Sequence, residues 1–583
     1  MRYVLSFPAP QTHHLQVALE LDRPGEAELF LPVWTPGSYL VREYARHLEG
    51  LEATDQAGLP VAVDRLDKHR FALHGAAAER VTVRYRVYAN DLTVRTSHVD
   101  ASHAFLAPAS VFLGVRGREG QPHEIAVELP AGWQVATALP GGPSRFTASD
   151  YDQLIDSPLE IGQHLSARFA VRGVEHELAV WGHGEVDLGR FTEDVQRVVE
   201  AQADFWGGLP YPRYLFVLHL TGKGRGGLEH LGSSVLLAPR ASFSDPEAYR
   251  DLLGLVSHEL FHAWNVKRLR PAAFTPYDYD REQYTRLLWW FEGVTCYYEQ
   301  LLLVRAGILS STHHLQALGK AVTSLLRTPG AEKLSVEEAS ALAWIKLYRP
   351  DENSGNSGVS YYLKGELTAL ALDLLLRRHG ASLDEVMRRL WVRHRDGGVP
   401  EGGVEPVVAE LTGAAEARAF FDRHVRGTAP LADDLQRELG QLGLALRRRP
   451  ARNGDDKGGK AAKVEEGAAS GWLGAELVNG AKLTVTSVRE GSPAWQAGLT
   501  ADDELLAEGG FRLDRAGLQS KLERRGPGGT LRLTLFRRDE LVKAVVTLGV
   551  PPEDTAWLEP EAAATEPQRA AFQAWCGVRW PGA

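Results

Sequence analysis

The stretch HELFH, from His258 to His262, decides more about this chain than any other short segment. On a helix, His258 and His262 are four residues apart and project from one face, close enough to share a metal ion. Glu259 lies beside them, where it can accept a proton from a water on that metal. This HExxH spacing is the pattern of zinc hydrolases, so it predicts a hydrolytic enzyme if a third ligand exists.

The residues around this motif predict a buried helix. The segment 252–266 has no proline, one glycine and many apolar side chains. Two histidines on a buried helix need polar partners, and one metal ion can serve both. The alternative is a pair of histidines that are hydrogen-bonded in the core without a metal.

We predict Glu292 as the third ligand. It lies in the apolar stretch LLWWFEGVTCYYEQLLL, residues 287–303, which also has the length of a helix. A carboxylate buried among aromatic side chains is costly unless it is paired or bound to a metal. Two histidines and one glutamate leave a fourth position for water, as in a catalytic zinc site. The alternative is a glutamate on the helix surface, and Glu299 further along is expected to be exposed or to support a ligand.

The composition indicates an enzyme with several domains. The chain has 583 residues, which is enough for several domains. Its net charge of −10 argues against a nucleic-acid partner, and its two cysteines are too few for a disulfide framework. Its first residues lack a cationic start followed by an apolar run, and no apolar stretch is long enough to span a membrane. We therefore expect a cytoplasmic location without membrane association.

Changes of pattern along the chain indicate its organisation. Residues 81–88 alternate between apolar and polar side chains, which predicts β-structure in the first part. A helix at 191–205 and a strand at 214–220 follow, and then mostly helices. Residues 451–466 are small and charged, as in a flexible linker.

The sequence after the linker resembles a bacterial PDZ domain over residues 467–550. The resemblance is carried by KLTVTSV and by REGSPAWQAGLTADDELLAEGGFRL, which follows it directly. It implies that Trp472, Leu473 and Gly474, in GWLGAEL, form the carboxylate-binding loop of a groove that binds a peptide C-terminus by strand addition. A structural module with a filled groove is the alternative. The tail, 551–583, is expected to dock on the body of the protein.

Three long strings in order, HELFHAWNVKRLRP, WWFEGVTCYYE and SYYLKGEL, resemble the glycyl aminopeptidase family of PDZ-containing zinc metallopeptidases. LPVWTPGSYLVREYARHL is similar to that family's N-terminal domain. The family belongs to the same broad group as thermolysin and aminopeptidase N, so the resemblance implies a multidomain α+β protein. The implied parts are an N-terminal β-sandwich (1–170), a thermolysin-like α/β catalytic domain (171–325), a helical domain (326–450), the linker (451–466), the PDZ domain (467–550) and the tail (551–583).

The resemblance also implies an oxyanion donor. YLKG, which starts at Tyr362, is similar to the aminopeptidase N pattern whose tyrosine steadies the oxyanion. Tyr362 is therefore the implied donor, and Tyr361 is the second choice. An aromatic side chain on the core face of a helix is the alternative for either residue.

A second motif implies the substrate-binding residues. GGLEH is similar to the aminopeptidase strand motif GAMEN, so Gly226 and Gly227 would line the substrate and Glu229 would bind its free α-amine. The chain departs from that motif at His230, which replaces asparagine. A solvent-facing glutamate is the alternative for Glu229. Three basic residues after the HELFH motif either reach a substrate carboxylate or form a basic face at a helix end; they are Lys267, Arg268 and Arg270.

The sequence thus predicts a zinc aminopeptidase with one Zn²⁺ per chain, acting on peptide substrates. Preference for a small first residue, glycine or alanine, is implied only by the family. A zinc endopeptidase whose PDZ domain captures the substrate is the second hypothesis. The third is a PDZ peptide-binding adaptor whose metal lobe is not catalytic, although such a protein would not need Glu259.

Overall fold

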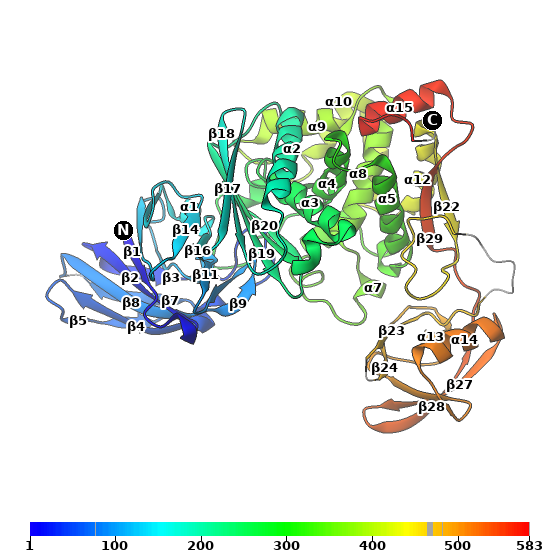
Figure 1. Cartoon of the computed structure of the whole chain (residues 1–583), viewed down its shortest axis with the longest axis horizontal. Helices are drawn as coiled ribbons and strands as arrows, with labels where there is room; N and C mark the ends of the chain where they lie inside the picture. The colour runs from blue at the N-terminus through cyan, green and yellow to red at the C-terminus, as the bar shows by residue number, and fades with distance from the viewer. Residues whose placement is uncertain (76, 463–469, 481, 582–583) are drawn as a thin grey trace. The chain divides into compact units, whose positions relative to one another are not determined.

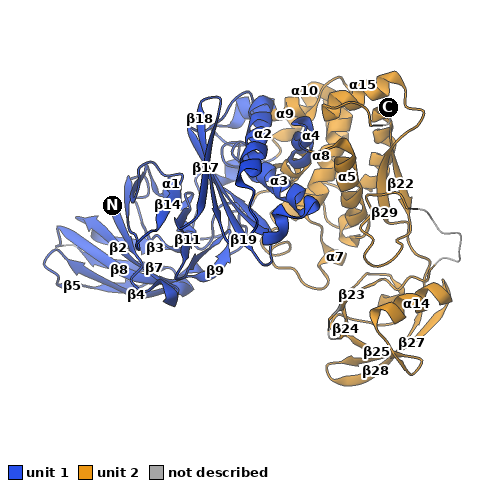
Figure 2. Ribbon diagram, viewed as in Figure 1, with its two compact units in different colours: residues 1–284, 298–308, 388–401 blue, residues 285–297, 309–387, 402–583 orange. Residues whose placement is uncertain are grey.

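The computed structural model describes residues 1–75, 77–462, 470–480 and 482–581. The chain forms two compact units (Figure 2). Unit 1 comprises residues 1–284, 298–308 and 388–401, and unit 2 comprises residues 285–297, 309–387 and 402–583. The helices α4 (Val294–Arg305) and α9 (Leu383–His394) each contribute residues to both units.

The first part of unit 1 consists of three sheets that share one hydrophobic core (Figure 1). Its strands alternate as predicted: in β8 (Arg80–Tyr88), Val81, Val83, Tyr85 and Val87 are buried and the residues between them are not. The strand order of the first sheet is β15 (Arg145–Ala148), β13 (His123–Glu128), β1 (Arg2–Ser6), β2 (His14–Asp22), β8, β4 (Leu48–Asp55) and β5 (Pro60–Val61). The order of the second sheet is β14 (Gln134–Thr137), β16 (Leu159–Gly162), β11 (His103–Leu106), β10 (Thr96–Val99) and β9 (Asn90–Thr93). The order of the third sheet is β12 (Gly114–Val115), β3 (Gly25–Phe30), β7 (Arg70–Gly75) and β6 (Val63–Arg65).

The second part of unit 1 begins after the short helix α1 (Tyr151–Ile155) and is a mixed sheet covered by helices. Its strand order is β17 (Leu165–Val171), β18 (Val174–Trp181), β19 (Arg213–Thr221), β21 (Ser233–Pro239) and β20 (Gly226–Glu229). β18, β19 and β21 run parallel, while β17 and β20 are antiparallel edge strands. α2 (Leu188–Trp206) contacts β17 and α3 (Pro246–Phe261) contacts β20 and β21, so α3 lies beside the edge strand β20. The predicted helix at 191–205 and strand at 214–220 are confirmed by α2 and β19.

Unit 2 begins with a bundle of helices that packs around α8 (Tyr361–Arg378), which ends at its C-cap residue His379. The other helices are α5 (Ser311–Leu326), α6 (Val336–Ala341), α7 (Ser354–Ser357), α10 (Val404–Thr412), α11 (Ala414–Phe420), α12 (Leu431–Glu438) and α15 (Glu566–Cys576). The C-terminal tail packs on this bundle as expected, because β29 (Thr555–Pro560) pairs with β22 (Leu444–Arg449) and contacts α5. In addition, Trp575 Nε1 in α15 donates a hydrogen bond of 2.8 Å to the Tyr297 hydroxyl.

A smaller module with its own core follows in unit 2. Its elements are β23 (Ala475–Asn479), β24 (Leu483–Val488), α13 (Pro493–Gln496), β25 (Glu504–Glu508), β26 (Phe511–Arg512), α14 (Arg515–Arg525), β27 (Thr530–Arg537) and β28 (Glu540–Thr547). β23 ends the sheet, since it pairs only with β24 among the described strands. The side chain of Leu473 belongs to the core of this module.

Part of the expected linker is packed against the bundle. Asp456, which is 6% exposed, accepts a hydrogen bond of 2.6 Å from Arg449 Nη1, and Gly459 N donates a hydrogen bond of 2.8 Å to Ala556 O. The expectation of a flexible segment is therefore wrong for this part, because charged residues in it pair with the body. Residues 463–466 of the expected linker lie outside the described residues. Within the described part of the chain, no helix is both long and apolar enough to cross a membrane.

Candidate metal centre and active site

The helix α3 carries the HELFH motif at its C-terminal end. It begins at Pro246, earlier than predicted, because Asp245 caps it by accepting hydrogen bonds from the amides of Glu247 (2.8 Å) and Ala248 (3.3 Å). It ends at Phe261, before the predicted end at Val266, whose φ of 104° is incompatible with a right-handed helix. His262 keeps helical angles as the C-cap, so the two histidines still share one face.

The imidazoles of His258 and His262 present their Nε2 atoms to each other. His262 Nδ1 lies 2.8 Å from the carbonyl oxygen of Asn265, and His258 Nδ1 lies 3.1 Å from Glu299 Oε2. Each Nδ1 therefore carries the proton, and each Nε2 carries a lone pair. These two Nε2 atoms are 3.1 Å apart. Two lone pairs repel at this distance unless a cation lies between them. The close approach of the two Nε2 atoms therefore fits a metal ion bound to both.

Glu299 has the supporting role that was one of its two expected places. Burial on its own would raise the pKa of this carboxyl, but the hydrogen bond from His258 opposes burial and helps to hold the pKa below its usual range. The ionised carboxylate therefore fixes the tautomer and the orientation of the His258 ring.

Glu292 lies in a π-helical turn, η6 (Trp289–Gly293), which runs directly into α4. The turn packs tightly on α8, because a Cβ added at Gly293 would lie 2.5 Å from the Cα atom of Gly365. Both positions therefore require glycine, which explains the glycines of the WWFEG and YLKG strings. A π-turn inside a helix frequently marks a functional site, and here it carries the predicted metal ligand.

Tyr362 lies within electrostatic range of Glu292. Burial raises the pKa of Tyr362 well above its usual value, and the charge of Glu292 raises the pKa further. The phenol therefore stays protonated and can donate a hydrogen bond, and its oxygen lies 3.4 Å from the Tyr348 hydroxyl. Tyr361, the second choice, is fully buried at the start of α8.

His258, His262 and Glu292 together fit a zinc ion. Each offers one ligand atom, these atoms all lie within 4.8 Å of one another, and all three residues are buried. Two imidazole nitrogens and one carboxylate oxygen are the donor set of many catalytic zinc sites, and they leave a coordination position open.

The edge strand β20 brings the predicted substrate-binding residues to the same place. The carboxylate of Glu259 rests against Gly227, where any Cβ would collide with it. Glu229 is 4% exposed, and its Oε1 atom has no hydrogen-bond partner among the described residues. Ligand atoms of Glu229, Glu259 and His262 lie within 4.8 Å of one another. A buried carboxylate oxygen with no donor is costly, which indicates a ligand that supplies one.

The basic residues after the motif are engaged within the protein. Lys267, which is 6% exposed, donates a hydrogen bond of 2.7 Å to Asp156, and His230 Nδ1 lies 3.1 Å from the same carboxylate. Burial would lower the pKa of Lys267, but Asp156 and the charge of Glu229 help to raise it to about 12. Arg268 donates to the carbonyl oxygens of two residues, at 2.7 and 3.1 Å. Asp156 was not predicted as a partner of these residues, because it lies far away along the chain.

A second buried group has the same composition as the predicted metal site. His103, Glu160 and His219 lie on β11, β16 and β19, and the three side chains are completely buried. The Nε2 atoms of His103 and His219 lie 3.1 and 2.9 Å from Glu160 Oε2. This group was not predicted from the sequence, because no local spacing connects residues on three separate strands.

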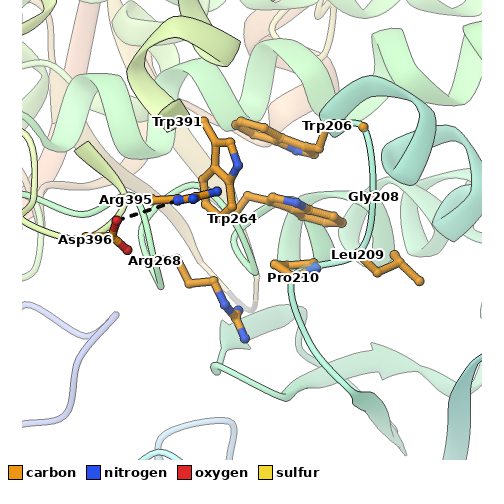
Figure 3. A pocket seen from close by; sticks show the side chains of 10 residues that line it. Trp206, Gly208, Leu209, Pro210, Trp264, Arg268, Trp391, Arg395 and Asp396 are labelled. Carbon is orange, nitrogen blue, oxygen red and sulfur yellow. Dashed lines mark ion pairs between the residues drawn. The ribbon is translucent and has the colours of Figure 1, made fainter. Parts of the chain in front are cut away.

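A cavity of about 550 Å³ in unit 1 is lined by three tryptophan side chains together with Arg268 (Figure 3). The rings of Trp206 and Trp264 stack with centroids 5.8 Å apart, and Trp391 packs against Trp206. None of the predicted ligands or catalytic residues lines this cavity. The chemistry, and not the volume of this cavity, therefore locates the candidate site.

Known proteins share this architecture. The model of the peptidase M61 N-terminal domain matches residues 2–163, and the model of the M61 glycyl aminopeptidase matches residues 251–368. An aminopeptidase N family protein from Idiomarina loihiensis, known as a crystal structure, is 33% identical, covers 99% of both chains and superposes with a TM-score of 0.93. No curated protein matches the chain.

More distant likenesses also exist. An M1 zinc metallopeptidase from Deinococcus radiodurans is 14% identical with a TM-score of 0.46, over 74% of this chain and 94% of that one. Yeast LTA4 hydrolase in complex with bestatin is 12% identical with a TM-score of 0.43, over 73% of this chain and 66% of that one. Neither likeness is strong enough to carry an argument. The family models and the Idiomarina structure are decisive: the chain belongs to the peptidase M61 family of glycyl aminopeptidases and is a metallopeptidase.

Proposed function

We propose that the protein is a zinc-dependent aminopeptidase that removes a small first residue, glycine or alanine, from peptides. Family membership supports the reaction class. The geometry of the histidine pair supports a bound metal ion. The two Nε2 atoms face each other at 3.1 Å, while both Nδ1 atoms are held by acceptors.

His258, His262 and Glu292 would hold one zinc ion per chain. A zinc ion held there lowers the pKa of a water ligand toward neutrality and polarises a carbonyl group. The protein contributes the orientation of the ligands: Glu299 and the Asn265 carbonyl direct the two Nε2 lone pairs to one point.

Glu259 would act as the general base. Its carboxylate lies at the edge strand β20, against Gly227, so it faces the place where a substrate backbone would pair with that strand. There it would accept the proton of the attacking water and later deliver it to the leaving amine. β20 ends its sheet, and Gly226 and Gly227 would line the substrate there, where Arg95 Nη2 donates a hydrogen bond of 3.2 Å to the Gly227 carbonyl oxygen.

Tyr362 would donate a hydrogen bond to the oxyanion that develops on the scissile carbonyl. The raised pKa of its phenol keeps the donor proton in place. Such a donor contributes on the order of 3 kcal/mol to the stability of the transition state.

Glu229 would bind the free N-terminal ammonium of the substrate and thereby restrict cleavage to the first peptide bond. Its buried Oε1, which lacks a donor among the described residues, is satisfied when an ammonium enters. The test is the Glu229→Ala variant. We expect the rate on alanine anilide to fall about 100-fold or more, while any cleavage of an N-acetylated peptide stays unchanged. Equal losses on both substrates would favour the endopeptidase hypothesis.

The module from 470 to 550 is proposed to be a PDZ domain that binds a peptide C-terminus. β23 ends the sheet and can accept a further strand, and Gly474, with φ of 75°, lies in the loop before it. Titration of the whole protein with peptides that have a free or an amidated C-terminus tests this proposal. Binding that does not distinguish the two would contradict it.

A further inference from the structure

A buried turn of the N-terminal β-structure reaches the proposed active site. Residues Thr35 to Ser38 form a turn with Pro36 and Gly37 at its centre, and Ser38 N donates to Thr35 O at 3.0 Å. Gly37 has a φ of 85°, as the third position of a type II turn requires. All four residues are buried, and Arg42 donates two hydrogen bonds, of 2.9 and 2.7 Å, to the Ser38 hydroxyl. Loops are rarely buried, so this turn has a fixed and specific place.

This turn covers the carboxylate of Glu229. A Cβ added at Gly37 would lie 2.5 Å from Glu229 Oε1, 2.7 Å from Oε2 and 2.7 Å from Leu228 Cδ1. At Gly37 the backbone of the turn therefore approaches the carboxylate closely. Because neither oxygen atom can move toward the turn, the backbone of Gly37 fixes the Glu229 carboxylate on that side.

We propose that the turn from Thr35 to Ser38 forms a wall of the pocket for the substrate's N-terminal ammonium, and that Gly37 is a specificity-determining residue. The proposal rests on the proposed role of Glu229. The substrate class that fits is a peptide with a primary, unblocked ammonium group. An acyl group on the nitrogen would remove the charge that pairs with Glu229, and it would need space that the turn already occupies.

The physical basis is the precision of charge pairing. The atoms nearest to a methyl group at position 37 belong to the Glu229 carboxylate and to a Leu228 methyl group, so these groups would be displaced first. A displacement of about 1 Å in a positioning group can cost about 100-fold in rate. The change would thus act on substrate binding and orientation while the metal ligands stay in place.

The first test is the Gly37→Ala variant with alanine anilide as substrate. We expect kcat/KM to fall about 100-fold. The zinc content and the affinity for a zinc-chelating hydroxamate without an amino group should remain those of the unmodified protein. Loss of zinc or of hydroxamate binding in parallel with activity would overturn the proposal, because it would indicate general damage.

Gly58 offers a matched control in the same part of the chain. Its φ of 80° is close to the 85° of Gly37, but a Cβ at Gly58 would meet nothing within 4 Å. The Gly58→Ala variant therefore carries a similar backbone strain without the contact. We expect it to keep kcat/KM within about twofold. If the two alanine variants lose activity equally, strain alone explains the effect and the proposal fails.

A double-variant cycle tests the contact without relying on turnover. Glu229→Ala removes the carboxylate that a methyl group at position 37 would strike. Gly37→Ala should therefore lower the melting temperature more in the original background than in the Glu229→Ala background. Equal shifts in both backgrounds would overturn the proposed contact. Failure of the proposed aminopeptidase function is distinguishable, because the unmodified protein would then not cleave alanine anilide at all.

Discussion

Two buried groups in this protein each combine two histidines with one glutamate, yet their atoms are arranged in opposite ways. In the group of His258, His262 and Glu292, the Nδ1 atoms are held by acceptors and the Nε2 atoms face each other. In the group of His103, Glu160 and His219, the Nε2 atoms are directed at the carboxylate instead. Neither Nδ1 atom of this second group has a hydrogen-bond partner among the described residues.

The two groups therefore differ in the surroundings of their histidines and not in composition, and the surroundings of the first group fit a metal site. Metal-bound histidines usually donate the other ring N–H group to an acceptor, and only the first group provides one for each ring. In the second group, a metal on both Nε2 atoms would leave two buried N–H groups without acceptors, which is costly. The second group is better explained as a carboxylate that accepts two imidazole hydrogen bonds and connects β11, β16 and β19.

The largest expected effect is a loss of turnover that occurs when the first group is changed but not when the second group is changed. Glu259→Gln should reduce turnover by about 10²–10⁴-fold, because the amide cannot accept the proton of water. The zinc content should not change, since Glu259 is not a proposed ligand. Glu160→Gln is the matched control in the second group and should retain turnover in the fraction that folds. A nearly normal rate for Glu259→Gln would remove this residue from the chemistry.

The next effect concerns the oxyanion donor. Tyr362→Phe should lower kcat by about 10²–10³-fold with little change in KM, because the hydroxyl acts only in the transition state. Tyr361→Phe is the neighbouring control and should lose far less, because that side chain is fully buried. Steady-state kinetics on alanine anilide give both constants. A larger loss for Tyr361→Phe would transfer the donor role to Tyr361.

A smaller effect tests the surroundings of the ligands directly. Glu299→Gln should weaken zinc binding by about 10–100-fold, because the neutral amide fixes the His258 ring less well. His103→Gln should leave zinc affinity and the ratio of one zinc per chain unchanged. Competition with a chelator, followed by metal analysis, measures both variants. A second zinc per chain that is lost in His103→Gln would contradict the contrast between the two groups.

The sequence was sufficient to predict those features that depend on residues within one short segment. The spacing of His258 and His262 and the alternation in residues 81–88 are visible in single segments, and both predictions agree with the structure. The capping by Asp245 was missed because it lies outside the apolar stretch. The π-turn that carries Glu292 depends on the contact of Gly293 with Gly365 in another helix, and a single segment gives no sign of it.

Several parts of the site were not predicted, because they depend on the tertiary fold and not on a single segment. The Asn265 carbonyl became an acceptor only because the chain leaves the helix after His262. The Glu160 group required three strands to be placed side by side. The cover of Glu229 by Gly37 likewise joins segments far apart in the sequence. Residue types and spacing predicted that His258, His262 and Glu292 come together, whereas the tertiary fold determined which groups hold them in place.

The smallest expected effect is a pH dependence of the stability of the fold, which arises from Glu160 in the second group. Burial alone would raise the pKa of Glu160, but His103 and His219 outweigh it and lower the pKa from the usual 4.5 to about 2. A carboxyl with a lowered pKa in the folded state stabilises the fold at every pH above 4.5. This contribution is lost as the pH falls from 4.5 through about 2.

Melting temperatures of the chelator-treated protein and of Glu160→Gln, measured from neutral to acid pH, test this expectation. The chelator removes the separate effect of acid on zinc binding. At neutral pH the variant should melt several degrees lower, because the amide pairs less well with the two histidines. As the pH falls below 4.5, the difference should shrink, since the original carboxylate also becomes neutral. A constant difference down to the lowest accessible pH would show that Glu160 is not ionised in the fold, and the two groups would then differ less than their geometry indicates.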